Sequence, residues 1–386
     1  MRADARTIAA AGQEYAMKIS AIRTHYVRIP FDMGAAKQEF AGLRFPSMDH
    51  LLVEVETDLG ITGWGEGFGH SIIPATKAAL ESYVGPWFIG KEATDIAALH
   101  REAAQAFHIF GRNGPVVYAH SAIDIALWDI AGKRAGLPLC DLLGGARRKE
   151  VRAYASLMRY GSPATVGKIC ADMVGRGFSH IKLHEHTLEA VRAAREAVGA
   201  GVAIMNDVNC PWSVAQALEM ERAYRPYQLR WLEEPVWPPE DHAGLARVRR
   251  GGATPIAAGE NGAGLRDFVD MFQKGSIDIA QPSVTKIGGI TELRKIAAAA
   301  EAHSVELIPH CAYFGPGNLA SIHLVASLAT DTLLENIYVN LEASPYGEAM
   351  LAADGKVRVP TRPGLGVDPD LAVVEKYRQG PIGLIR

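Results

Sequence analysis

The sequence lacks several features that mark particular classes of protein. Its four cysteines lie far apart in 386 residues and form no C-x-x-C pair, so neither a zinc site nor a disulfide framework is indicated. No uncharged apolar run approaches the length of about 18 residues that a membrane span requires. The 40 Lys and Arg residues nearly balance the 43 Asp and Glu residues, which leaves no excess of positive charge to hold a nucleic acid. We therefore expect a cytoplasmic protein with no nucleic-acid or membrane partner.

What the sequence does contain is the composition of a globular protein, with 48% hydrophobic and 22% charged residues. A chain of this length exceeds one ordinary core and favours either two domains or one large barrel with an appendage. The first clear strand pattern begins at Met17, so we expect residues 1–16 to form a flexible extension.

The segment 17–145 is predicted to be an α+β domain. Alternating apolar residues over 51–56, followed by glycine-containing turns, indicate antiparallel strands. The apolar spacing then becomes helical, most clearly in 121–136 (SAIDIALWDIAGKRAG), with a stop at Gly136.

Beyond residue 151, short β-rich runs alternate with alanine-rich helical stretches, which is typical of an α/β fold. Seven of these runs end near Lys182, Asp207, Glu233, Glu260, Ser283, His310 and Glu335. Successive ends are separated by 23 to 27 residues, the length of one strand, one helix and two loops. With the run at 151–156 as first strand, this repeat predicts the eight β/α units of a TIM-type barrel over 151–345. The strand- and turn-like tail, 346–386, is expected to return and pack on the N-terminal domain.

Polar residues gather at the carboxyl ends of the predicted barrel strands, where such barrels place their active sites. They are Lys182, His184, Asp207, Asn209, Glu233, Glu260, His310 and Glu335. Three carboxylates at consecutive strand ends, Asp207, Glu233 and Glu260, would repel one another without a cation, and ligation by oxygen alone selects a hard ion. For each acid alone a solvated loop residue is the likelier interpretation, but three acids at matching positions of the repeat predict a Mg²⁺ site.

Two histidines are candidates for proton transfer. Lys182 and His184 are two residues apart, so both project to the same side of their strand, into the barrel mouth. Lys182 can stabilise a bound anion, and neutral His184 can act as a base near pH 7. His310 follows strand seven, across the barrel from strand two. A substrate on the metal would therefore meet a proton-transfer group on each face.

Together these motifs resemble the enolase superfamily, in the branch of mandelate racemase and acid-sugar dehydratases. The resemblance rests on SAIDIALWDIAGK and PLCDLLGG before the barrel, NDVN, WLEEP and GEN at strand ends, TKIGG after strand six, and PGLGV in the tail. It implies that the N-terminal domain caps the barrel and that the C-terminal tail completes this cap.

The resemblance also assigns roles to individual residues. It implies that the three carboxylates are the metal ligands and that Lys182 is the first lysine of the family's K-x-K motif. His310 resembles the strand-seven catalytic histidine, and Glu335 resembles the strand-eight acid that hydrogen-bonds to the substrate carboxylate. The remaining residues expected to bind substrate or support the ligands are Asn209, Glu234, Asn261, Lys286, Arg44 and Phe45.

Two positions depart from the family pattern. The second lysine of K-x-K is here His184, and the strand-six aspartate that orients the strand-seven histidine is here Ser283. A neutral serine cannot stabilise an imidazolium as a carboxylate does, so we expect His310 to be a weaker base than in a His-Asp pair. Mandelate racemase activity itself is therefore not expected. Ser283 also does not supply the strand-six lysine of the muconate-cycloisomerase and dipeptide-epimerase branches.

The resemblance implies Mg²⁺-dependent removal of the proton α to a carboxylate, which gives an ene-diolate. We expect a lyase that dehydrates a sugar acid, because β-elimination requires only one well-placed acid/base residue. The alternative is a racemase, epimerase or cycloisomerase acting on a hydroxy acid or sugar-acid lactone. A metal-binding barrel without catalysis is disfavoured, because the ligands and both histidines are present. We expect a small-molecule carboxylate as partner and a homo-oligomeric assembly.

Overall fold

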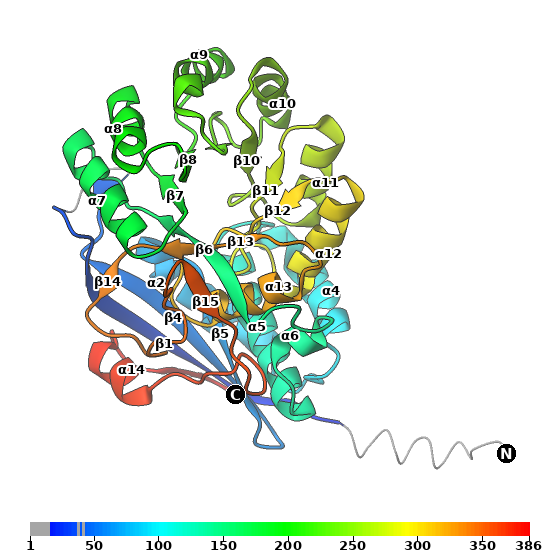
Figure 1. The fold of residues 1–386 in the computed structure, drawn as a ribbon. Helices are drawn as coiled ribbons and strands as arrows, with labels where there is room; N and C mark the ends of the chain where they lie inside the picture. Colours follow the sequence, from blue (N-terminus) through cyan, green and yellow to red (C-terminus); the bar gives the residue numbers. More distant parts are fainter. Residues whose placement is uncertain (1–15, 37–38, 41–42) are drawn as a thin grey trace.

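The computed structural model of the chain describes residues 16–36, 39–40 and 43–386. The predicted N-terminal extension therefore lies outside the described residues, except for Ala16 at its end. Two sheets organise the fold, a small antiparallel one and a large curled parallel one (Figure 1). Among the described residues, none of the helices is long and apolar enough to cross a membrane.

The N-terminal domain is built on an antiparallel sheet with the strand order β14-β1-β4-β5. Its first strands are β1 (Ile19–Asp32), β4 (Ser47–Thr57) and β5 (Thr62–Gly67), with a separate short pair β2 (Glu39–Phe40) and β3 (Leu43–Arg44). The helical elements that follow are η1 (His70–Ile72), α2 (Ile73–Ala79), η2 (Leu80–Val84), α3 (Gly85–Phe88), α4 (Ile96–Phe107), η3 (His108–Phe110), α5 (Pro115–Ala135) and α6 (Leu139–Leu142). Helix α5 ends at Gly136, which has φ +68° and confirms the predicted stop.

Two glycines of β5 allow helix α5 to lie unusually close to the sheet. A Cβ atom at Gly65 would be 1.8 Å from the carbonyl oxygen of Ala122, and one at Gly63 would be 2.2 Å from that of Ala126. Any side chain at either position would therefore push the helix away. This close packing fixes α5 on the sheet.

Eight parallel strands form the barrel in the order β12-β11-β10-β9-β8-β7-β6-β13, which confirms the predicted TIM-type fold. They are β6 (Glu150–Ser156), β7 (His180–Leu183), β8 (Ala203–Asp207), β9 (Leu232–Glu233), β10 (Ile256–Ala258), β11 (Ile279–Ala280), β12 (Glu306–Leu307) and β13 (Leu333–Ile337). The surrounding helical elements are α7 (Pro163–Gly175), α8 (Leu188–Val198), α9 (Val214–Tyr224), η4 (Arg225–Tyr227), α10 (His242–Gly251), α11 (Leu265–Lys274), α12 (Gly289–Ala302) and α13 (Pro316–Ser327).

The interior of the barrel is a packed core. Seven side chains from different strands fill it, all at most 3% exposed: Tyr154, Met205, Trp231, Ala257, Ile279, Ile308 and Leu333. No ladder pairing joins β12 to β13 among the described strands, but Thr332 Oγ1 donates to the Leu307 carbonyl at 2.7 Å. Because the lower interior is filled, polar chemistry is restricted to the mouth at the carboxyl ends of the strands.

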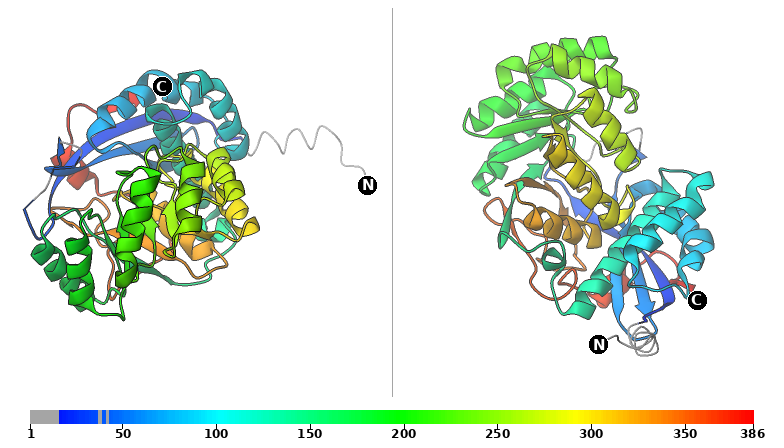
Figure 2. Two further views of the ribbon diagram at one scale, coloured as in Figure 1. Left: turned by 90° about the horizontal axis from the view of Figure 1, so that it is seen from above. Right: turned by 90° about the vertical axis from the view of Figure 1, so that its right-hand side faces the viewer.

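The C-terminal segment joins the two domains. Its elements are β14 (Asn340–Leu341), β15 (Lys356–Arg358), α14 (Leu371–Tyr377) and β16 (Gly383–Ile385). Strands β14 and β16 pair with β1 of the N-terminal sheet, while β15 pairs with β6 of the barrel. Figure 2 shows this segment, in orange and red, lying against both domains.

The N-terminal domain is tied to the barrel by buried hydrogen bonds. Trp128 Nε1 in α5 donates to Thr291 Oγ1 in α12 at 2.9 Å, and Asp124 in α5 accepts from the Thr291 backbone N–H at 3.0 Å. Glu66 in β5 accepts from the backbone N–H of Gly317, at the start of α13, at 3.0 Å. These contacts hold the domain, hereafter the cap, against the barrel.

Candidate active site

Three carboxylates lie together at the barrel mouth, as the repeat predicted. Asp207 and Glu233 end the neighbouring strands β8 and β9 and are direct partners in the ladder, while Glu260 follows β10. One oxygen from each side chain lies within 4.8 Å of the other two. Oxygens that bind one Mg²⁺ at 2.0–2.1 Å are about 3 to 4 Å apart, so this triad fits a hard divalent ion.

Lys182 is fully buried among the carboxylates. Its Nζ lies 2.9 Å from Glu233 Oε1, 2.8 Å from Glu335 Oε1 and 3.6 Å from Asp207 Oδ2. Burial would lower the pKa of Lys182, but the surrounding carboxylates outweigh it and hold the pKa well above its usual value. One ammonium thus faces three acids, and this leaves a local excess of negative charge.

The excess negative charge contributes to a raised pKa of Glu233. Burial raises the pKa of this carboxyl to about 8, and the neighbouring Asp207 and Glu335 add to the rise while Lys182 opposes it. Burial also acts on Glu335, but Lys182 outweighs it and lowers the pKa to about 2. A second cation in this cluster would lower the pKa of Glu233 and favour its ionised form.

Neither Lys182 nor Glu335 lines the cavity at the mouth. Lys182 was predicted to project into the barrel mouth, but it is fully buried beneath the cavity, and Glu335 Oε2 accepts from the Cys311 backbone N–H at 2.7 Å. The two side chains contact each other in this structure. Their predicted contact with a substrate carboxylate stays a prediction.

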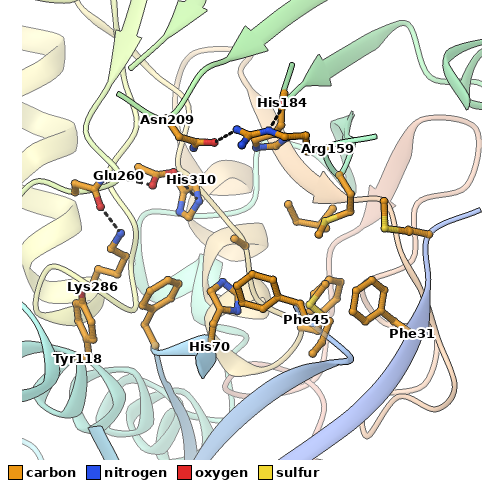
Figure 3. Close-up of a pocket in the computed structure, with 18 residues that line it drawn as sticks. Phe31, Phe45, His70, Tyr118, Arg159, His184, Asn209, Glu260, Lys286 and His310 are labelled. Atoms are coloured by element: carbon orange, nitrogen blue, oxygen red, sulfur yellow. Dashed lines mark hydrogen bonds and ion pairs between the residues drawn. The ribbon is translucent and has the colours of Figure 1, made fainter. Parts of the chain in front are cut away.

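A cavity of about 370 Å³ lies above the triad, between the barrel mouth and the cap (Figure 3). Seven of the predicted site residues line it: Phe45, His184, Asn209, Glu260, Asn261, Lys286 and His310. The side chain of Arg44, predicted to bind substrate, lies outside the described part of the structure. The volume is at the lower end of the range for small-molecule sites.

The two histidines flank the triad on opposite sides. His184 Nε2 lies 3.4 Å from Asp207 Oδ2, and its Nδ1 contacts the carbonyl oxygen of Leu157. Because a carbonyl only accepts, Nδ1 carries a proton, and Nε2 is the nitrogen that faces the triad. His310 Nε2 lies 3.0 Å from Glu260 Oε2, which also only accepts when ionised, so here Nε2 is the donor. Nε2 of each ring therefore lies beside a carboxylate oxygen of the triad.

His310 has no carboxylate behind it. Ser283 Oγ lies 3.4 Å from the Tyr313 hydroxyl, and that hydroxyl donates to the His310 backbone carbonyl at 2.8 Å. The buried Nδ1 of His310 finds no hydrogen-bond partner among the described residues. Burial lowers the pKa of His310, and the neighbouring carboxylates of Glu260 and Glu335 oppose this shift.

A second polar network supports Glu260 from behind. Asn261 Nδ2 donates to both oxygens of Glu234, at 3.2 and 3.0 Å, and to Glu260 Oε1 at 3.3 Å. Lys286 Nζ donates to Asn261 Oδ1 at 2.9 Å and lies 4.8 Å from the centre of the Phe68 ring. Burial raises the pKa of Glu234 well above its usual value. These three predicted residues meet, and they hold the loop that carries Glu260.

Sequence reasoning missed Arg159, which organises the opposite side of the mouth. Its Nε donates to the His184 carbonyl at 2.7 Å, and its Nη2 donates to Asn209 Oδ1 at 3.1 Å. Asn209 has φ +51°, in the left-handed region that asparagine tolerates better than most residues. The polar residues listed from the sequence came from the ends of strands two to eight. Arg159 lies three residues after the end of strand one, which was not included. Including the residues that follow strand one would have identified Arg159.

The fold and site define an enzyme in which an α+β cap closes a barrel that carries an acidic triad and two histidines. Two family profiles match the chain, "Mandelate racemase / muconate lactonizing enzyme, N-terminal domain" over residues 45–144 and "Enolase C-terminal domain-like" over residues 166–373. The chain belongs to the mandelate racemase and muconate lactonizing enzyme family of the enolase superfamily, which confirms the resemblance stated above.

Similar proteins cover nearly the whole chain. It is 33% identical over 383 residues to a D-galactarolactone cycloisomerase from Agrobacterium fabrum, covering 94% of this chain and 99% of the relative. It is 35% identical over 356 residues to a D-galactonate dehydratase from Ralstonia pickettii, covering 86% and 92%. The crystal structure of L-talarate dehydratase from Polaromonas sp. JS666, complexed with Mg and L-glucarate, matches with TM-score 0.81 and 28% identity, covering 96% of this chain and 99% of that one.

Proposed function

We propose that this enzyme removes the proton α to the carboxylate of a small hydroxylated acid in a Mg²⁺-dependent reaction, and that it dehydrates a sugar acid. The observation that carries the proposal is the acidic triad, with His184 beside Asp207 and His310 beside Glu260, below the cavity between barrel and cap. Asp207, Glu233 and Glu260 would hold Mg²⁺, which when bound supplies positive charge to the substrate carboxylate as negative charge develops there.

The histidines divide the proton transfers. His184 takes the α proton at Nε2, and this leaves an ene-diolate. His310 acts as the general acid in its imidazolium form, which the contact with Glu260 favours, and its Nε2 gives a proton to the β-hydroxyl, so that the Cβ–O bond breaks and water leaves. The resulting enol tautomerises to a 2-keto acid. Arg159 fixes His184 and Asn209 in place through its hydrogen bonds.

Cycloisomerisation of a sugar-acid lactone is the second candidate. It is favoured by the similarity to the D-galactarolactone cycloisomerase, which extends over 94% of this chain. Both reactions pass through the same ene-diolate and differ in the group that leaves or returns. The number of water molecules released therefore distinguishes them: one in dehydration and none in cycloisomerisation.

The test combines metal removal with a substrate screen. Purified protein is treated with EDTA, restored with Mg²⁺, and offered mono- and diacid sugars and their lactones. Formation of 2-keto acid and exchange of the α proton in D₂O are followed. We expect both to vanish with EDTA, to return with Mg²⁺, and to be lost in Glu233→Gln. Full activity in protein shown to be metal-free would overturn the proposal.

A further inference from the structure

The cavity has two walls of opposite chemistry. The polar wall is formed by the barrel residues described above. The other wall, hereafter the apolar wall, consists of Phe31, Met33, Phe45, Met48, Met158, Phe314 and Ile337. Its members come from strand β1 and the segment after it, from the start of β4, and from loops or ends of three barrel strands. Residues far apart in the sequence thus build one continuous apolar surface.

The polar groups of the cavity lie away from this wall or are already engaged. Figure 3 shows Lys286 and Tyr118 at one end of the cavity, with Phe31 and Phe45 toward the other. Arg159 and Lys286, the two basic side chains among the described lining residues other than histidines, are bonded to Asn209 and to Asn261, respectively.

His70 is a polar side chain of the cap that lies close to Phe45. Its ring lies 6.2 Å from the Phe45 ring and 4.9 Å from the Phe68 ring, centre to centre. Burial lowers its pKa to about 4, so it is neutral at pH 7 and cannot balance a second carboxylate. Among the described residues that line this end of the cavity, it adds one donor or acceptor to side chains that offer only carbon and thioether sulfur.

We propose that the sugar acid is a monocarboxylic deoxy acid, whose carbons beyond the α and β positions carry few or no hydroxyl groups, with its distal part packed on the apolar wall. This inference rests on the proposed function, because it places the carboxylate and the two reacting carbons at the triad. The distal hydroxyls of a fully hydroxylated acid would face Phe31, Met33 and Met48, which are at most 7% exposed and offer no strong partner. A diacid would bring a second charge to the same surface.

The magnitude of the preference follows from the nature of the wall. A hydrophobic pocket discriminates against one added hydroxyl group by roughly 10²-fold. We therefore expect a 2,3-dihydroxy acid with an alkyl end to have kcat/KM about 10²-fold higher than the acid of equal length with all carbons hydroxylated. A diacid of equal length should be turned over more slowly still.

The experiment compares these three acids of equal length in the Mg²⁺-loaded enzyme, by 2-keto acid formation and by α-proton exchange in D₂O. The same comparison is made in Met33→Gln and Met48→Gln, which place an amide on the apolar wall at nearly constant volume. Met220→Gln, on the outer helix α9, is the matched control, and Met33→Leu is the conservative variant. Circular dichroism establishes that each variant is folded.

The inference would be supported if the wild type prefers the alkyl-ended acid and if Met33→Gln or Met48→Gln reduces this preference at least tenfold. Met220→Gln and Met33→Leu should leave the preference unchanged. Equal or faster turnover of the fully hydroxylated acid or the diacid in the wild type would overturn it while leaving the proposed function intact. Absence of α-proton exchange with all three acids and with the sugar-acid panel would overturn both. A preference that persists unchanged in both glutamine variants would remove the apolar wall as its cause.

Discussion

Replacing Lys182 by methionine should cost stability as well as activity, because this lysine is the counter-ion of the buried acids. Its Nζ lies within 3 Å of both Glu233 and Glu335, and it has no exposed surface. Removing one partner of a buried pair typically costs about 3–5 kcal/mol, since the other charge is left without compensation. Met fills a similar volume, so the loss is one of charge. We expect Lys182→Met to lose this amount in metal-free protein at pH 7.5.

The loss should depend on pH and on metal. In the wild type, the pKa of Glu335 is held at about 2, below its unfolded value, so its stabilisation is present above about pH 4.5 and disappears as the pH falls toward 2. Without Lys182 the carboxyls bind protons more readily in the folded state, so the variant should become less stable as pH rises. Mg²⁺ at the triad should restore part of the loss, because it neutralises two of the same acids.

Urea unfolding followed by tryptophan fluorescence, with EDTA or with Mg²⁺, measures these differences. Lys274→Met is the matched control, because Lys274 pairs with Asp270 on the exposed surface of α11, where such a pair contributes about 0.5 kcal/mol or less. A loss below about 1 kcal/mol in Lys182→Met, equal with EDTA and Mg²⁺ and unaffected by pH, would refute the reasoning.

Further predictions concern metal binding and proton transfer. Mg²⁺ binding at pH 7 should release protons, because the pKa of Glu233 is about 8 and a ligand must be ionised; calorimetry in buffers of different ionisation enthalpy should show this release, and it should fade above pH 9. His184→Asn should lose both turnover and α-proton exchange in D₂O, whereas His310→Asn should lose turnover yet keep some exchange; the reverse pattern would exchange their roles. Ser283→Asp should raise the pKa of His310 and move the pH profile of turnover upward, and an unchanged profile would show that position 283 does not reach the ring.

The sequence predicted the features that repeat, and the structure confirms them where it describes them. The spacing of strand ends was sufficient to find Asp207, Glu233 and Glu260, because equivalent positions of a β/α repeat meet at one face of the barrel. The sequence did not predict that Lys182 is buried below the mouth. Its ion pair with Glu335 holds it there, and Glu335 lies on a strand that is distant in sequence. Only the assembled barrel brings these two side chains together.

The apolar wall could not be predicted from the sequence either. Met33 and Met48 follow the same apolar pattern as the residues that fill the core of the cap, and both are nearly fully buried. Alternation along a strand identifies the face that avoids water, but it does not say whether that face meets other side chains or a ligand. Arg159 was missed for a different reason, because its hydrogen bonds run to His184 and Asn209 in other β/α units.

The pairing of β16 with β1 has a consequence for the order in which the protein can fold. Strand β1 is among the first described residues to leave the ribosome, while β16 is among the last. Until then one edge of the N-terminal sheet has unpaired backbone groups, which favours non-native strand association. The barrel strands are synthesised in the interval, so they can associate before the sheet of the cap is complete. Ribosome-bound chains halted before residue 383 should therefore contain a barrel whose cap is still open to proteolysis.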